Sequence, residues 1–354
     1  MARDQRALEH VPEMRLQCAS FSAHSFSPKV QLGRAAFRFL AGSSLTEGFY
    51  QTHGVSEAVR SLQKEVRLAA TVVFSSAMAQ YAPPHIPLLL DMVDVDSEKW
   101  FQYSQTRRPN FFYRAEGIRL REVERRYSRL AKCVILTTEQ EAGILRRYAP
   151  DSQKIRAIEN GVDSDFFDPH RFPKDPELAK RRYVVLVGAM DYYPNSEGAA
   201  WFAREVFPRL REQCKDIEFL IVGHQPQHFV RKLASIPGIT VTGYVPDVRP
   251  YLALSLAVVA PLRIARGIQN KVLEALVMGK EVVASVELGR TFGESVPTGL
   301  TVCGAVEDYV NAILRIAGSG SREPDLEIRQ NTIERFSWDK KLACLDEELQ
   351  AIVG

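Results

Sequence analysis

Short runs of β-branched and other apolar residues alternate along this chain with longer, charge-bearing helical patterns. Strands that are apolar throughout are buried on both faces, and the helices between them return the chain so that consecutive strands run parallel. The alternation therefore predicts an α/β fold with parallel sheets. The predicted strands are Thr71–Ser76, Pro87–Val93, Cys133–Thr138, Tyr183–Gly188, Ile217–Gly223, Ile239–Thr242, Ala257–Ala260 and Glu281–Ser285.

The length of 354 residues favours two domains, at a prior of about 150 residues for each. A segment rich in turn residues follows Glu159 and includes Pro169, Pro173 and Pro176, which indicates a boundary there. We expect a first lobe over residues 1–160, a second over 161–337 and a closing helix over 338–354. The first plausible strand is Val11–Phe21, and Tyr113–Ala131 has an amphipathic helical pattern.

The balance of 46 basic and 43 acidic residues gives a formal net charge of +3, so we expect no nucleic-acid partner. The five cysteines are scattered and form no C-x-x-C pair, so neither a disulfide framework nor a zinc site is indicated. This pattern fits a reducing, cytoplasmic compartment. The longest apolar stretch, Tyr251–Leu262, is shorter than the roughly 20 residues of a membrane span. No apolar region typical of a secretory signal follows the N-terminus.

Two segments of the second half could bind an anion at the carboxyl edge of a parallel sheet. The first runs from Val187 to Asn195, where Gly188 and Ala189 form a turn whose N–H groups could face a phosphate. Taken alone, this segment favours an ordinary βα turn, because neither the dinucleotide nor the P-loop glycine pattern is present. The aromatic residues Tyr192, Tyr193 and Trp201 fit either a ligand pocket or the core.

The second segment runs from Pro261 to Lys280. Gly267 allows close approach of a ligand, and a helix is expected to end at Met278, with Gly279 just past its end. Lys271 and Glu274 are neighbours on that helix, and a surface ion pair is the simplest explanation for them. Arg263 and Arg266 favour an anion site instead, because they add positive charge beside the same helix start.

These segments resemble the retaining, family-four type of GT-B glycosyltransferases. The stretch from Gly267 to Ser285 matches the donor-site helix of that family, with a lysine, a glutamate three residues later and then M-G-x-x-V-V-A. The interdomain pattern N-G-V-D-x-x-x-F-x-P begins at Asn160, and the F-S-W that precedes the closing helix begins at Phe336. Three further segments narrow the resemblance to one subgroup: Ser75–Tyr81, Asp94–Ser97 and Gly188–Tyr192. Together with the motifs above, they make the chain similar to sugar transferases associated with bacterial exopolysaccharide and PEP-CTERM sorting systems.

The resemblance implies a GT-B fold, in which two Rossmann-like lobes have parallel sheets that face each other across a cleft. It implies a sugar transferred from a UDP or GDP donor to a carbohydrate or lipid-linked acceptor, with retention at the anomeric carbon, in exopolysaccharide biosynthesis. The donor is a cosubstrate, and no metal or separate cofactor is implied. The family also starts with a strand and a glycine-rich loop that we do not find, so we expect the first lobe to lack its opening βαβ unit.

The resemblance also implies roles for single residues. Lys271 would contact the donor diphosphate, and Glu274 would contact the ribose hydroxyls. The family has another glutamate eight positions before Glu274, where this chain has Arg266. We therefore expect the donor to be held by Gly188, Ala189, Arg263, Gly267, Lys271 and Glu274, with Arg266 among the catalytic residues.

Asp94 and Asp96 follow a predicted strand of the first lobe. They match the D-x-D by which metal-dependent GT-A enzymes hold a cation, but the phosphate-binding features lie in the other lobe. We favour an acceptor-side catalytic role, in which one of them orients the acceptor hydroxyl. A loop or helix-capping role is the alternative.

The segment Arg114–Arg129 holds six arginines and three glutamates, and most such segments are solvated helix surface. A sharper hypothesis is peripheral docking on anionic lipid at the inner face of the plasma membrane. Three other functions stay open: a sugar-nucleotide epimerase with the same fold, a catalytically inactive nucleotide-sugar-binding scaffold, and an NAD-dependent dehydrogenase. The dehydrogenase is disfavoured, because the glycine fingerprint is missing.

Overall fold

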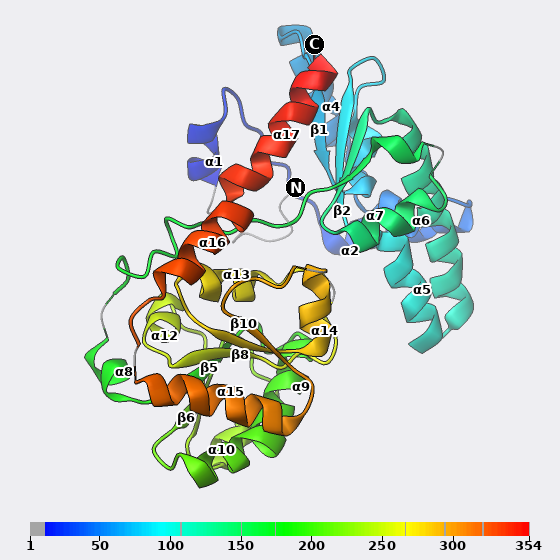
Figure 1. Cartoon of the computed structure of the whole chain (residues 1–354). Helices are drawn as coiled ribbons and strands as arrows, with labels where there is room; N and C mark the ends of the chain where they lie inside the picture. The colour runs from blue at the N-terminus through cyan, green and yellow to red at the C-terminus, as the bar shows by residue number, and fades with distance from the viewer. Residues whose placement is uncertain are drawn as a thin grey trace. The chain divides into compact units, whose positions relative to one another are not determined.

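The computed structural model describes residues 11–106, 108–149, 151–173, 175–265, 267–293, 295–320 and 322–353. The chain divides into two compact units. Unit 1 runs to Ile158 and also includes the chain from Cys344 onward, and unit 2 is Glu159–Ala343. Figure 1 shows both units, with labels on most of their helices and some of their strands.

Unit 1 contains a four-stranded parallel sheet in the order β1-β2-β3-β4. Helices α6 and α7 pack against one face of this sheet, around Leu90, Leu120 and Leu136. The other face contacts the end of α17, where Leu345 and Leu349 pack against residues of β2 and β3. The elements are β1 Thr71–Phe74, β2 Leu88–Val93, β3 Cys133–Leu136, β4 Ile155–Ala157, α5 Asp96–Thr106, α6 Asn110–Leu130, α7 Glu139–Arg146 and α17 Trp338–Val353.

Four helices precede β1 in unit 1: α1 Val11–Gln17, α2 Pro28–Leu40, α3 Leu45–Phe49 and α4 His53–Glu65. The prediction of a strand over Val11–Phe21 is wrong, since this segment begins with the helix α1. Met14 and Leu16 alternate with polar residues, as in a strand, but both side chains are exposed, so this run buries no apolar face in a sheet. The short helix α3 is capped by Ser44 and by the buried carboxylate of Glu116, which accepts hydrogen bonds from the N–H groups of Leu45 and Thr46.

Unit 2 contains a six-stranded parallel sheet in the order β10-β9-β8-β5-β6-β7. One apolar core lies between the sheet and α9, α10 and α15, and a second lies on the opposite face with α12, α13 and α16. Figure 1 shows α10 and α15 below this sheet and α12 and α13 above it. The strands are β5 Tyr183–Val187, β6 Glu218–Val222, β7 Ile239–Gly243, β8 Ala257–Ala260, β9 Val282–Ser285 and β10 Leu300–Cys303.

The helices of unit 2 return the chain between these parallel strands. They are α8 Pro176–Lys180, α9 Tyr193–Trp201, α10 Phe207–Gln213, α11 His228–Arg231, α12 Arg249–Ala253, α13 Asn270–Val277, α14 Val286–Gly289, α15 Val306–Ser319 and α16 Leu326–Phe336. Helix α13 ends as predicted, with Met278 at its C-cap and Gly279 at φ 70°. The α/β class with two parallel sheets is therefore confirmed. Each of the eight strands predicted between Thr71 and Ser285 is present.

The turn-rich segment after Glu159 is held against the residues that lead into α17, all within unit 2. The N–H of Val162 donates to the carbonyl of Phe336 at 2.7 Å, and the N–H of Trp338 donates back to Val162 at 3.3 Å. A Cβ atom at Gly161 would lie 2.7 Å from the ring of Trp338. The two motifs around Gly161 and Trp338 are therefore parts of one contact, in which only glycine leaves room for the indole.

Among the described residues, no helix has both the length and the apolar character needed to cross a bilayer.

Candidate functional site

The strand order of unit 2 reverses between β5 and β8. From β5 the chain continues through β6 to β7 on one side, and it then returns to place β8, β9 and β10 on the other. In open α/β sheets, ligands bind outside the carboxyl ends of the strands at such a reversal. The two segments selected from the sequence lie there, because one follows β5 at Val187 and the other follows β8 at Ala260.

Two glycines bring the backbones after β5 and β6 into contact. The N–H of Gly188 donates to the carbonyl of Val222 at 3.0 Å, and the N–H of Met190 donates to His224 at 3.0 Å. A Cβ atom at Gly223, where φ is 153°, would lie 1.7 Å from the carbonyl oxygen of Gly188. A side chain is therefore excluded at Gly223, and the turn at Gly188 is fixed by its neighbour strand.

Lys271 lies directly beside this turn. Its ammonium group donates a hydrogen bond to Oδ1 of Asn195 on α9, and Nδ2 of Asn195 donates to the carbonyl of Ala189 at 2.9 Å. A Cβ atom at Gly188 would lie 2.7 Å from Asn195 Nδ2 and 3.1 Å from Lys271 Nζ. Gly188, Ala189 and Lys271 are thus brought together, and Asn195 fixes the position of the ammonium group.

The charge of Lys271 is poorly solvated. Burial lowers the pKa of Lys271 to about 8, an effect that the nearby carboxylate of Glu274 partly opposes. Burial also raises the pKa of Glu274, against the opposing effect of Lys271. No ion pair joins the two side chains, both of which lie in the described part of the chain, so the surface ion pair considered from the sequence does not form. An ammonium group without a carboxylate partner at close range is suited to bind an anion.

Arg263 lies on a different side of α9. It forms an ion pair with Glu197 at 3.0 Å, and 63% of its side chain is exposed. Both residues line a hollow of about 600 Å³ at the ends of β8, β9 and β10, together with Tyr193 and Trp201. Gly267 adopts a φ of 62° before the start of α13, and the predicted site residue Arg266 lies outside the described residues.

Sequence reasoning missed Asn195 and Gly223. Asn195 follows Pro194 in the first turn of α9, a signal that marked only a helix start, and its contact with Lys271 joins residues 76 positions apart. Gly223 ends the predicted strand Ile217–Gly223, and its tight approach to Gly188 depends on the pairing of β5 with β6.

Asp94 and Asp96 lie at the carboxyl end of β2 in unit 1. Asp94 is exposed and accepts a hydrogen bond from Thr137 Oγ1 at 3.1 Å, whereas Asp96 is the first residue of α5. Burial raises the pKa of Asp96, although Lys99 opposes this, and Asp94 raises it further. Val93 between strand and loop has a φ of 67°, which is strained for a β-branched residue. Within the described residues, no group of three or more acidic, histidine or cysteine side chains is placed to hold a metal ion.

Glu124 lies behind this loop and is fully buried. It accepts hydrogen bonds from the N–H of Ser97 at 2.9 Å, from Ser97 Oγ at 2.6 Å and from the hydroxyl of Tyr148 at 2.6 Å. Burial raises the pKa of Glu124 to about 7, against the opposing effect of these hydrogen bonds. The start of α5 is therefore fixed from below by a buried carboxyl group.

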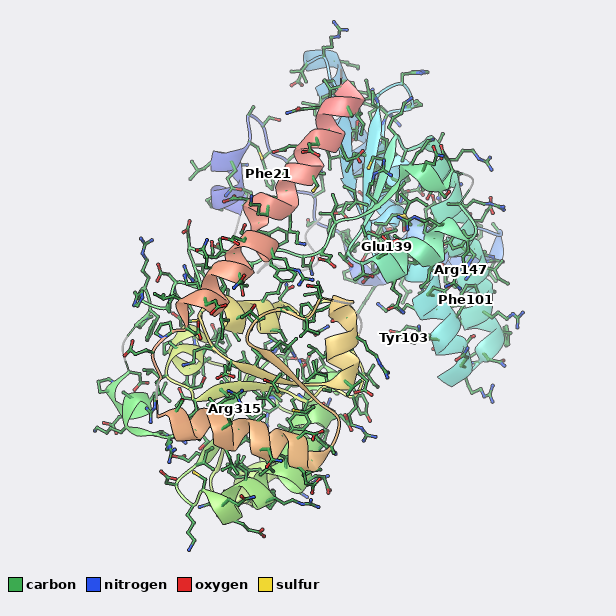
Figure 2. All side chains as sticks on the ribbon, viewed as in Figure 1. Phe21, Phe101, Tyr103, Glu139, Arg147 and Arg315 are labelled. Carbon is green, nitrogen blue, oxygen red and sulfur yellow. The ribbon has the colours of Figure 1, made fainter. Side chains whose placement is uncertain are left out.

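Three of the six arginines of Arg114–Arg129 on α6 form ion pairs with carboxylates of unit 1. Arg121 pairs with Glu98 and lies over the ring of Phe101 on α5, whose position Figure 2 labels. Arg126 pairs with Glu47, and Arg119 donates to the carbonyls of Phe39 and Ser43. Arg125 lies 3.7 Å from Glu122. These contacts hold α6 within unit 1 and neutralise part of its charge, whereas Arg114 and Arg129 are exposed and form no ion pair with any described residue.

Comparisons with known proteins show what the chain is similar to. Residues 181–330 match the model of a family described as glycosyl transferases group 1. A search of curated protein sequences gave no match.

Solved structures show that the whole chain has the GT-B fold. A glycosyltransferase from Rickettsia africae is 15% identical with a TM-score of 0.62, over 99% of this chain and 88% of that one. Sucrose-phosphate synthase from Thermosynechococcus elongatus is 18% identical with a TM-score of 0.60, over 84% of this chain and 77% of that one. HepE of Anabaena in complex with UDP is 13% identical with a TM-score of 0.60, over 84% of this chain and 82% of that one. The predicted fold class is confirmed.

Proposed function

We propose that this chain is a glycosyltransferase that moves a sugar from a nucleotide diphosphate donor, a UDP- or GDP-sugar, to a carbohydrate or lipid-linked acceptor. One observation carries the proposal: the Lys271 ammonium group is held by Asn195 over Gly188, at the strand-order reversal of unit 2, within the residues that match the glycosyltransferase family model. A lysine without a close carboxylate partner, beside a glycine turn and a helix start, suits a diphosphate. HepE was solved with UDP, which supports this choice of donor.

In this proposal the leaving diphosphate binds against Lys271, the backbone of Gly188 and Ala189, and the first N–H groups of α13. These N–H groups have no acceptor within their own helix, and they point toward its start. Positive groups fixed in advance stabilise the charge that grows on the diphosphate as the sugar–phosphate bond breaks. Glu274 is one helical turn from Lys271 and would accept hydrogen bonds from the ribose hydroxyls. Arg263, Arg266 and Gly267 would complete the donor side.

On the acceptor side we propose Asp94 or Asp96 as the group that orients the attacking hydroxyl. Retention at the anomeric carbon and a role in exopolysaccharide biosynthesis in the cytoplasm also belong to the proposal. A lipid-linked acceptor is supported by an apolar hollow of about 770 Å³ in unit 1, which is lined by Val55, Val59, Leu62, Val73 and Met78 among others. WaaG, a glycosyltransferase of lipopolysaccharide biosynthesis, has a similar structure at 14% identity and a TM-score of 0.58.

The test is a product analysis with a panel of UDP- and GDP-sugars, with and without carbohydrate and polyprenyl-phosphate-linked acceptors. A glycosylated product whose formation needs the acceptor, and is lost in Lys271→Ala, supports the proposal. An altered sugar nucleotide without acceptor would identify an epimerase instead. Nucleotide-sugar binding without turnover of any donor would identify an inactive binding protein.

A further inference from the structure

Helix α2 lies in a stretch of unit 1 that is basic and has no acidic residue. From Arg15 to Thr46 the sequence holds no aspartate or glutamate, and α2 carries Lys29, Arg34 and Arg38. These three side chains are exposed, and in the described part of the chain none of them has a carboxylate within ion-pair distance. Their charge therefore faces solvent uncompensated, unlike that of the paired arginines on α6.

The same helix also exposes large apolar side chains. Gln31 and Ala35 are buried against the rest of unit 1, whereas Val30 is 53%, Phe37 75% and Leu40 84% exposed. Val30 and Phe37 are seven residues apart and Phe37 and Leu40 three, so the three share the side of α2 that points away from the buried pair. Exposed apolar residues gathered on one side of a helix mark an interaction surface more often than single ones do.

Basic side chains continue from α2 onto α4. A hollow of about 660 Å³ lies between the two helices and is lined by Arg34, Phe37 and Arg38 of α2 and by His53, Ser56 and Arg60 of α4, among others. Arg60 is exposed, and it too lacks an ion pair in the described part of the chain, whereas His53 contacts Glu57 at 3.0 Å. The hollow thus places three guanidinium groups beside the exposed ring of Phe37.

We propose that this surface, defined as Lys29, Val30, Arg34, Phe37, Arg38, Leu40 and Arg60, docks unit 1 on an anionic phospholipid bilayer. The apolar side chains would enter the interfacial region, and the arginines would bind lipid phosphates, one of them in the hollow. Basic residues next to exposed aromatic and aliphatic side chains are the complement of an anionic lipid surface. The proposal does not depend on glycosyl transfer, since it concerns binding alone. It replaces α6 by α2 as the lipid-binding element.

The test is co-sedimentation of the full chain with vesicles of phosphatidylcholine alone and with vesicles that also contain phosphatidylglycerol. Binding is expected to the anionic vesicles and to weaken with added salt. The double variant Arg34→Gln, Arg38→Gln is expected to bind them about 25-fold more weakly, because each basic residue near the surface contributes about fivefold. The matched control is Arg114→Gln with Arg129→Gln, which removes the same charge from exposed positions of α6 that form no ion pair with any described residue.

A second variant, Phe37→Gln with Leu40→Gln, tests the apolar contribution at positions whose side chains are exposed. It is expected to weaken binding at every salt concentration, whereas the arginine variant loses its effect at high salt. Three results would overturn the proposal: no binding of the unaltered chain to anionic vesicles, equal loss in the α6 control, or binding that both α2 variants leave unchanged. Circular dichroism of each variant shows whether the fold is retained.

Discussion

A side chain at Gly188 would meet both Lys271 and the asparagine that positions it. A Cβ atom there would lie 2.7 Å from Asn195 and 3.1 Å from Lys271. Gly188→Ala is therefore expected to displace the ammonium group and to weaken nucleotide diphosphate binding at least about tenfold, the cost of losing roughly 1.4 kcal/mol. Calorimetric titration measures the affinity.

Gly318→Ala is the matched control for that substitution. Gly318 lies on α15 of the same unit, and a Cβ atom there would meet nothing within 4 Å. This variant should bind nucleotide as the unaltered chain does and should be more stable by about 0.5–1 kcal/mol. If Gly188→Ala and Gly318→Ala bind the nucleotide diphosphate equally well, the position of the Lys271 ammonium group beside Gly188 does not matter for binding.

The protonation of Lys271 gives a pH prediction. Its pKa is lowered by burial to about 8 in the free protein, and a bound diphosphate would raise it again. Affinity is therefore expected to be full well below pH 8 and to fall as the pH rises through 8, by up to about tenfold per unit. Titrations at several pH values, in buffers of different ionisation enthalpy, measure both the affinity and the proton uptake.

Lys271→Met provides the control for the nucleotide's own ionisation. This variant keeps a long side chain but has no group that titrates, so the fall above pH 8 should vanish. A pH profile that is the same in the variant and the unaltered chain would exclude Lys271 as the group that binds the anion.

At the scale of elements, Gly279 shows what fixes the end of α13. It has a φ of 70°, and a Cβ atom there would lie 2.8 Å from the backbone N and O of Asp325. Gly320 ends α15 at a φ of 67°, but its added Cβ would meet nothing. Gly320→Ala is expected to cost about 1–2 kcal/mol from the left-handed conformation alone, and Gly279→Ala distinctly more. Urea unfolding measures the free energy of unfolding of both variants. Equal losses of stability would show that the backbone at Asp325 shifts to accommodate the added Cβ atom at little cost.

The elements differ in how far the sequence could predict them. Strands such as Tyr183–Val187 are apolar throughout and were predicted, because burial on both faces determines their composition. The edge strands β4 and β10 were missed: β4 has only three residues, and β10 has two of its four residues outside the core. The helix α1 was mistaken for a strand, because Met14 and Leu16 alternate with polar residues over a run too short to show a helical period.

The candidate site could be predicted only where a motif lies on one segment. Lys271 and Glu274 share a helix, so the sequence alone placed them together. Asn195 was not found, because its contact with Lys271 depends on β5 and β8 being neighbours in the sheet. Arg263 was predicted to add positive charge beside Lys271, because the two residues are close in the sequence. In the structure it forms an ion pair with Glu197 on α9, a contact between distant parts of the chain.

At the scale of the whole molecule, the chain from Cys344 onward belongs to unit 1 although it follows unit 2. Leu349 is half-buried against the sheet of unit 1, whereas Leu342 on the same helix is 41% exposed and lies in unit 2. Leu349→Ala is expected to destabilise unit 1 by about 1–2 kcal/mol and leave nucleotide binding unchanged. Leu342→Ala should have a smaller effect. Hydrogen exchange of the amide groups in β2 and β3 measures the loss of stability in unit 1. Equal protection of these strands in the Leu349→Ala and Leu342→Ala variants would contradict the prediction.

The most direct test of the donor site is a calorimetric titration of UDP, GDP and ADP into the chain and its variants. We predict selective binding of one diphosphate, weakened at least about tenfold by Lys271→Ala and clearly by Glu274→Ala. Lys215→Ala, an exposed lysine that precedes β6 at the opposite edge of the sheet, should bind as the unaltered chain does. No binding of any diphosphate to the folded protein, or equal affinity in Lys271→Ala, would contradict the account.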